Sequence, residues 1–245
     1  ATFPTPYPGS YIVKKAFKTR KTNEIGLAIE RAFAQGLMVD ERTFETSIYF
    51  FFKENRIVLG MKCFDYFILQ AKNNNSLPPI SSFKIVIKFL LKQKNLKKMV
   101  QILFVSMGDR SEICVADEYL CSLVLNYCSN IQRMDIAEKI SQQMDKNNIK
   151  KTNVTYSILI KGYGNQNRLD LVKHTLHNMR LTNTKPDIIT LNTLIDTYAK
   201  CNELSISLNM VDKMEKSKSS VSVLPNLRTY NTLIKWLGKY KKLEE

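Results

Sequence analysis

The chain has 245 residues, of which 44% are apolar, and it carries a formal net charge of +15 at pH 7. That apolar fraction is ordinary for a folded protein, and no apolar run approaches the roughly 20 residues that a membrane-spanning helix needs. A folded chain this basic usually binds a polyanion or an anionic surface, and a charge that serves only solubility is the alternative.

Residues 1–10 hold three prolines and a glycine, which predicts an extended lead. A basic stretch without acidic residues follows between Lys14 and Lys21. Since Val13, Ala16 and Phe17 also begin an apolar helical pattern, we favour a helix of a repeat array here. The end of a targeting segment is the alternative.

Six later segments place their apolar residues at i, i+3, i+4 and i+7, with one small exception, as on the buried face of an amphipathic helix. The six faces are Phe44, Ser47, Ile48, Phe51; Phe83, Val86, Ile87, Leu90; Leu120, Leu123, Val124, Tyr127; Tyr156, Leu159, Ile160, Tyr163; Leu191, Leu194, Ile195, Tyr198; and Tyr230, Leu233, Ile234, Leu237. Their first residues step by 39, 37, 36, 35 and 39 positions, and a near-constant period with a constant face predicts a repeat array.

Residues 153–187 show one complete unit. A first helix is predicted from about Val154 to Tyr163, with a turn at Gly164, Asn165 and Asn167. A second helix places four apolar residues on one face, and a polar loop closes the unit at Pro186 and Asp187. The four are Leu169, Val172, Leu176 and Met179. Because one such hairpin cannot bury both of its faces, neighbouring hairpins must stack.

The segments VTYSILIKGYGNQNRLD, ITLNTLIDTYAKCNELS and RTYNTLIKWLGKYKKLE resemble pentatricopeptide repeats. The resemblance is strong over residues 153–240, weaker over 41–152 and marginal over 11–40. It implies an all-α fold, a right-handed α-solenoid of about six to seven helical hairpins. We expect an extended lead over 1–10, degenerate helical repeats over 11–152, and well-matched repeats over 153–245, of which the last is incomplete.

The resemblance also implies binding of single-stranded RNA, one base per repeat, because single strands expose their Watson–Crick edges. In the family, the residue after the opening aromatic and the last residue of the repeat read each base. Those positions here pair Ser157 with Asp187, which resembles a guanine reader, and Asn192 with Asn226, which resembles a cytosine reader with uracil as a near alternative. Asn231 supplies half of a third pair. Alternatively, these Ser and Asn residues are only exposed helix-start residues, where both are favoured.

Each base would be clamped by flat side chains: Val154 and Ile189 around the first, Ile189 and Arg228 around the second. The upstream repeats depart from the family's code, since their pairs would be Glu45 with Pro79, Lys84 with Ala116, and Cys121 with Thr152. None of these three is a familiar reading pair, so at most two repeats and half of a third are expected to read sequence.

Seven lysines continue the face of the reading positions along the first helix of each hairpin, at steps of four residues. They are Lys84, Lys88, Lys92, Lys161, Lys200, Lys235 and Lys239, and Asp196 is the acidic residue of the same stripe. We predict a phosphate-binding track on the concave surface of the array, with an ordinary solvated helix face as the alternative.

No catalytic residues, metal ligands or cofactor motifs are identified: the two histidines, His174 and His177, lack nearby partners, and the five cysteines show no CxxC pair. The favoured function is therefore an RNA-binding protein of a mitochondrion or plastid, the compartment that the resemblance implies. Two alternatives stay open. One is a scaffold subunit of an organellar ribosome or other large assembly, with protein partners; the other is the repeat domain of a larger enzyme such as protein-only RNase P.

The last segment supplies one helix up to Leu237 and turn residues from Gly238 to Lys242, and Leu243 falls in the first turn of a second helix. Arrays normally end in a polar-faced cap, so we expect the natural protein to continue beyond Glu245.

Overall fold

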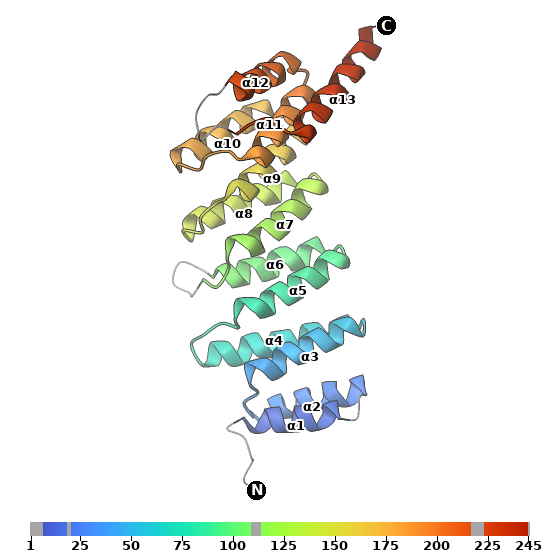
Figure 1. Ribbon diagram of the computed structural model, residues 1–245. Helices are drawn as coiled ribbons and strands as arrows, with labels where there is room; N and C mark the ends of the chain where they lie inside the picture. Colours follow the sequence, from blue (N-terminus) through green and yellow to red (C-terminus); the bar gives the residue numbers. More distant parts are fainter. Residues whose placement is uncertain (1–6, 19–20, 109–113, 217–222, 245) are drawn as a thin grey trace. The chain divides into compact units, whose positions relative to one another are not determined.

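The computed structural model describes residues 7–18, 21–108, 114–216 and 223–244. These residues form thirteen helices and no strand, which confirms the predicted all-helical class (Figure 1). The helices are α1 (Pro8–Phe17), α2 (Thr22–Ala34), α3 (Glu41–Lys53), α4 (Ile57–Asn73), α5 (Ile80–Lys92), α6 (Leu96–Met107), α7 (Glu118–Asn130), α8 (Met134–Lys146), α9 (Asn153–Asn165), α10 (Leu169–Leu181), α11 (Ile188–Lys200), α12 (Leu204–Lys216) and α13 (Leu227–Glu244).

Successive helices pair as hairpins, in which we name the odd-numbered helix A and the even-numbered helix B. The A helices α3, α5, α7, α9 and α11 have 13 residues each, and three residues connect each of them to its B helix. The middle residue of each connection has a positive φ, a region in which Asn is enriched; these residues are Asn55, Lys94, Gln132, Asn167 and Asn202. Length variation therefore falls outside the A helix and its turn.

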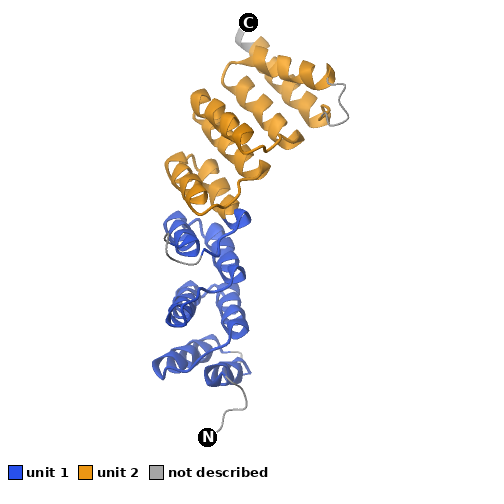
Figure 2. Ribbon diagram, turned by 90° about the vertical axis from the view of Figure 1, so that its left-hand side faces the viewer, with its two compact units in different colours: residues 1–120 blue, residues 121–245 orange. Residues whose placement is uncertain are grey.

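Two compact units divide the chain, residues 1–120 and residues 121–245 (Figure 2). In the first unit, the A helices α1, α3 and α5 contact one another in chain order, and each packs on its own B helix. Its core is rich in phenylalanine: Phe44 stacks on Phe67 at 4.5 Å between ring centroids, and Phe64 meets Phe83 edge-on at 5.2 Å. All four side chains are at most 2% exposed.

In the second unit, the A helices α9, α11 and α13 contact one another in order, and α10 and α12 pack on α9 and α11. Its core is mostly aliphatic, and one cluster joins Ile195, Val211, Met214 and Leu233. Met144, Met179 and Met214, which recur every 35 residues, are all buried near the ends of B helices. Both units are thus stacks of helical hairpins, as predicted.

Most of the predicted faces are confirmed as buried, but the third was shifted by one residue. The predicted face ran through Leu120, Leu123, Val124 and Tyr127, and two of these side chains are only half-buried. In the other repeats, the buried face begins four residues after the residue that precedes the A helix. The equivalent position in α7 is Cys121. The buried set there is Cys121, Val124, Leu125 and Cys128, each 0% exposed. Leu120 is also fully buried, and this extra apolar residue misplaced the prediction.

Three predicted boundaries also need correction. Residues 8–10 of the expected lead are helical, since Pro is favoured in a first helical turn and the Gly9 amide donates to the Met38 carbonyl at 3.0 Å. Helix α9 continues through Gly164, where a Cβ would lie 2.4 Å from Cγ2 of Thr197. Glycine therefore permits a close approach of two helices there, rather than a turn.

The turn predicted over residues 238–242 is wrong as well, because α13 is helical through Gly238. Glycine inside a helix costs only about 1 kcal/mol relative to Ala. The Tyr240 hydroxyl offsets that cost by donating its proton to the Ala199 carbonyl, 2.9 Å away, and it also lies 3.0 Å from Asn202 Oδ1. Of the last predicted face, Leu233 is buried while Tyr230, Ile234 and Leu237 are at least 42% exposed.

Candidate nucleic-acid interface

The predicted reading positions lie where successive A helices meet, and a local geometry that recurs between repeats places them. The residue preceding α11, Asp187, accepts a hydrogen bond from the Thr190 amide at 2.7 Å and thereby caps the helix. The Thr190 hydroxyl also donates to the same carboxylate oxygen, at 2.8 Å. Thr190 is fully buried, so its hydroxyl is fixed between the cap and the preceding A helix.

The first predicted pair is joined through this threonine. The Ser157 hydroxyl on α9 lies 3.0 Å from Thr190 Oγ1, which in turn contacts Asp187. Ser157 and Asp187 are both half-buried, rather than exposed helix-start residues. The structure thus brings the two residues of the predicted pair to one place.

The second predicted pair is in direct contact. Asn192 Nδ2 on α11 donates to Oδ1 of Asn226, the residue preceding α13, at 3.3 Å. The Thr229 hydroxyl donates to Asn192 Oδ1 at 2.6 Å and also lies 3.1 Å from Asn226 Oδ1. Asn192 is only 5% exposed, so the alternative of a merely exposed helix-start residue does not describe it.

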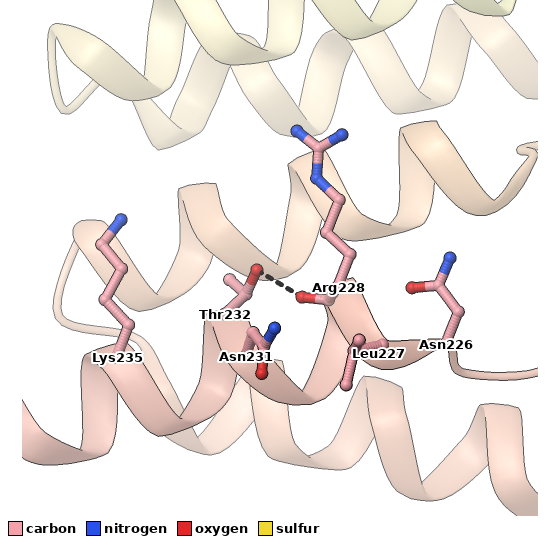
Figure 3. A pocket seen from close by; sticks show the side chains of 6 residues that line it. All are labelled: Asn226, Leu227, Arg228, Asn231, Thr232 and Lys235. Atoms are coloured by element: carbon pink, nitrogen blue, oxygen red, sulfur yellow. Dashed lines mark hydrogen bonds between the residues drawn. The ribbon is translucent and has the colours of Figure 1, made fainter.

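Along α13, six residues line an open depression of about 550 Å³. Figure 3 shows Arg228 and Lys235 extending from the same side of the helix, with Asn231 between them. The Thr232 hydroxyl donates to the Arg228 carbonyl at 2.8 Å, and Arg228 is exposed. Asn231 is also exposed.

The predicted clamping residues occupy the second position of their A helices and point outward. Val154 is 56% exposed and Ile189 is 59% exposed, although both are large and apolar. Two exposed apolar side chains at equivalent positions of consecutive repeats suit a surface that contacts flat, apolar groups.

A groove of about 310 Å³ crosses α9, α11 and α13, and cations and amides line it. Its charged members are Lys161, Asp196, Lys200, Arg228 and Lys235, four cations against one carboxylate. Lysines of the stripe reach the preceding A helix: Lys161 Nζ donates to Asn130 at 3.2 Å, Lys200 Nζ to Asn165 at 2.7 Å, and Lys235 Nζ to Asp196 at 3.3 Å. The first two partners are neutral amides, so those ammonium charges are held in place without being neutralised.

The aromatic ring of Trp236 organises the end of this stripe. Its Nε1 donates to Asp196 at 2.7 Å, and the ammonium groups of Lys235 and Lys239 lie 4.8 and 4.6 Å from the ring centroid. Such cation–π contacts hold lysines near a ring without removing their charge.

In the first unit, the equivalent positions are occupied differently. The Glu45 carboxylate accepts a hydrogen bond from Ser82 at 3.0 Å and another from Ser81. Lys84 pairs with the Asp117 carboxylate at 2.7 Å, so its charge is neutralised. Lys88 lies 5.4 Å from the Tyr119 ring centroid, and Lys92 is exposed at the end of α5.

The PPR repeat family model matches three overlapping segments, residues 116–165, 154–200 and 186–239, which together span just over half of the chain. The chain belongs to the PPR repeat family. No curated protein sequence matches the chain.

Among the described residues, no helix is long and apolar enough to cross a membrane, and no cluster of three or more His, Cys, Asp or Glu residues could hold a metal ion.

Solved structures of another PPR protein share the fold. The crystal structure of PPR10 in complex with an 18-nt psaJ RNA element matches 86% of this chain at 16% identity, with a TM-score of 0.50. The crystal structure of PPR10 from maize matches 89% at 17% identity, with a TM-score of 0.47. This chain spans about one third of each, 30% and 34%.

The one-residue shift in α7 means that the sequence reasoning missed two positions of this PPR chain. The position equivalent to Ser157 is Ser122, not Cys121, and the position equivalent to Asp187 is Asp117, not Ala116. The signal was present in the cap, because Asp117 Oδ1 accepts from the Leu120 amide at 2.8 Å just as Asp187 does from Thr190. Reading the repeats from their caps, rather than from their first apolar residue, would have found both.

Proposed function

We propose that this protein binds single-stranded RNA along the A helices of its second unit, with one base per repeat. The observation that carries the proposal is the groove across α9, α11 and α13, where four cations and the buried Asn192 line one surface. Single-stranded RNA offers the complementary features, a phosphate backbone and exposed base edges. The PPR10 complex with RNA supports the same reading by its fold.

In this proposal, the reading pairs are Ser157 with Asp187 and Asn192 with Asn226, and Asn231 contributes to a third. Val154, Ile189 and Arg228 lie beside these pairs at exposed positions, where they would stack on the bases. Phosphates would meet Lys161, Lys200, Lys235 and Lys239. Because exposed apolar and cationic side chains lie along the same helices, both parts of a nucleotide find a partner.

The proposal is tested by the salt dependence of RNA binding. If Lys161, Lys200, Lys235 and Lys239 all meet phosphates, the logarithm of the association constant falls against the logarithm of salt concentration with a slope of about −3. The measurement is fluorescence anisotropy with a short, labelled single-stranded RNA at salt concentrations between about 0.05 and 0.3 M. A flat dependence would remove the phosphate track.

A scaffold subunit of an organellar ribosome or other assembly is a second candidate, and the first unit favours it. There the Lys84 charge is neutralised by Asp117 and a carboxylate, Glu45, occupies a reading position, so this surface suits a base poorly. Purification of the native protein at physiological salt separates the two candidates. A short, defined RNA footprint supports the reader, whereas bulk ribosomal RNA with protein partners supports the scaffold.

We also propose a mitochondrial or plastid location, which rests on membership of the PPR family. Imaging of the native protein carrying a fluorescent tag, together with organelle markers, tests this location. A signal that stays outside both organelles would contradict it.

A further inference from the structure

Two buried threonines connect the residues of the predicted reading pairs, and the acceptor of each hydroxyl proton can be assigned. Thr190 and Thr229 occupy the third position of α11 and α13 and are both 0% exposed. Each lies between the reading residue of the preceding repeat and the cap residue of its own helix. Neither was singled out from the sequence.

At the first pair, the direction of every hydrogen bond follows from counting protons. An ionised carboxylate only accepts, so the single hydroxyl proton of Thr190 goes to Asp187 Oδ1, 2.8 Å away. The bond of 3.0 Å between Ser157 and Thr190 must then be donated by Ser157. Ser157 keeps only lone pairs for a ligand, and both bonds to Asp187 end on Oδ1, which leaves Oδ2 as a further acceptor.

The second pair has the opposite polarity. The Thr229 proton goes to Asn192 Oδ1, the nearer acceptor at 2.6 Å rather than 3.1 Å. Asn226 Oδ1 accepts from the Thr229 amide at 3.1 Å and from Asn192 Nδ2 at 3.3 Å. Asn226 Oδ1 thus accepts two bonds, whereas Asn192 Oδ1 accepts one and keeps one lone pair. Most of the groups left for a ligand are the remaining N–H donors of Asn192 and Asn226.

We infer that Thr190 and Thr229 are positioning residues that set the donor–acceptor polarity of the two reading pairs. This inference rests on the proposed function and deepens it. Acceptors alone at Ser157 and Asp187 favour a base edge with two adjacent donors, as the N1–H and N2–H₂ groups of guanine provide. The excess of donors at Asn192 and Asn226 favours an edge rich in acceptors, as in cytosine or uracil.

The first unit shows what happens when the threonine is replaced. The third position of α7 is Leu120, which has no hydroxyl, and there Lys84 contacts the cap Asp117 directly at 2.7 Å. At α5 the third residue is Ser82, which donates to the Glu45 carboxylate. At α5, α11 and α13 the hydroxyl of the third residue thus contacts the reading residue of the preceding repeat, whereas at α3 the Thr43 hydroxyl donates to its own cap residue, Asp40, at 2.8 Å.

The test replaces each threonine by valine, which has a similar shape but no hydroxyl, in the full chain. RNAs are first selected by the unchanged protein from a randomised pool of short single strands, which locates the nucleotide at which guanine is preferred and the nucleotide at which a pyrimidine is preferred. Affinities are then measured for RNAs that differ only there. Thr175→Val is the matched control, because Thr175 is a buried residue of α10 whose hydroxyl bonds the Leu171 carbonyl at 2.7 Å, away from the groove.

We expect Thr190→Val to lower the preference for guanine over adenine about fivefold, the scale of one lost hydrogen bond, and to leave the pyrimidine preference unchanged. Thr229→Val should lower the pyrimidine preference and leave the guanine preference unchanged. Thr190→Ser should keep the guanine preference of the unchanged protein, because serine retains the hydroxyl. A purely structural role would alter affinity for all RNAs together. Thermal unfolding of each variant shows that it is folded, and the two threonines test the inference separately if one variant does not fold.

Two outcomes overturn the inference, and they differ in what they say about the proposed function. If Thr190→Val keeps the guanine preference while Ser157→Ala loses it, base reading stands and the role of the threonine is refuted. If the unchanged protein shows no base preference at any nucleotide, base reading fails and the inference falls with it.

Discussion

The two units have the same A helices and turns but different chemistry at the helix starts. In the second unit, hydroxyls and amides connect each A helix to the next through Thr190 and Thr229. In the first unit, the equivalent positions hold the charged residues Glu45 and Lys84. Glu45 accepts a hydrogen bond from a serine, and Lys84 forms an ion pair with an aspartate. Helical repeats of one length can therefore carry either a polar, ligand-ready surface or one that is internally satisfied.

The two units also differ in the side chains that form their cores. The first unit packs phenyl rings against one another, whereas the second uses Ile, Val, Leu and Met. Close approach of α9 to α11 at Gly164 brings Ser157 and Thr190 within hydrogen-bond distance in the same pair of helices. Packing and surface chemistry thus vary together between the units.

The largest expected effect comes from removing one core ring, and it tests whether the units are separate. Phe64 is fully buried and meets Phe83 edge-on, so Phe64→Ala should destabilise the first unit by about 3–5 kcal/mol. Hydrogen exchange read by mass spectrometry should show lost protection within residues 1–120 and retained protection within 121–245. Tyr49→Ala, at a side chain that is 58% exposed on α3, is the control and should change little. Equal loss in both units would mean that the array unfolds as one.

A second, smaller effect separates the surfaces of the units. Replacing Lys161, Lys200 and Lys239 together by alanine should weaken RNA binding roughly a hundredfold at about 0.1 M salt, since each phosphate contact contributes about fivefold on a slope of about 0.7 per contact. Replacing Lys84, Lys88 and Lys92 should weaken binding less, by about 25-fold at most, because Lys84 is paired with Asp117 and only two contacts remain. Both losses should be similar for all sequences, because phosphate contacts carry no sequence information.

The matched control for both lysine sets is Lys139, Lys173 and Lys213 changed to alanine. These exposed lysines lie on the B helices α8, α10 and α12 of the second unit, and their removal lowers the net charge by the same amount. Equal weakening by all three sets would indicate that only the total charge matters, and it would erase the distinction between the surfaces.

The smallest expected effect concerns acid. Partial burial acts to raise the pKa of Asp40, but hydrogen bonds from Ser10, Thr43 and Lys14 outweigh it and lower that pKa from 3.8 to about 2. A carboxylate whose pKa is lowered by folding stabilises the protein above its ordinary pKa, and this contribution is lost as pH falls from about 4 towards 2. The Asp40→Asn variant lacks this carboxyl group. Its hydrogen-exchange protection around α1 and α3 should therefore fall less steeply over that pH range than the protection of the unchanged protein. An identical pH profile in both proteins would show that Asp40 is not the group responsible.

Much of this architecture could be predicted because it depends on spacing within one helix. The faces that begin at Phe44, Phe83 and Tyr156 are buried as the apolar period requires. At α7 the same reasoning failed by one residue, since Leu120 and Cys121 are both apolar enough to begin the pattern. The cap at Asp117 decides the register, and a cap is a contact rather than a periodicity.

The reading pairs show the limit more sharply. Ser157, Asp187, Asn192 and Asn226 were identified by their position in the repeat, but their burial and partners depend on the next repeat. Asn192 is 5% exposed because Thr229 and Asn226 cover it from a helix more than 30 residues later. Likewise, α13 remains helical past Gly238 because Tyr240 reaches back to α11, a contact that local propensity does not reveal.

Six residues connect α10 to α11, but ten connect α12 to α13, and the contacts that follow are the same in kind. Thr190 and Thr229 each bond the reading residue of the preceding A helix, at 3.0 and 2.6 Å, despite the four additional residues before the second. The contact between successive A helices at these positions is thus kept when the connecting loop is longer. An insertion between a B helix and the next A helix can therefore be designed without disturbing this contact.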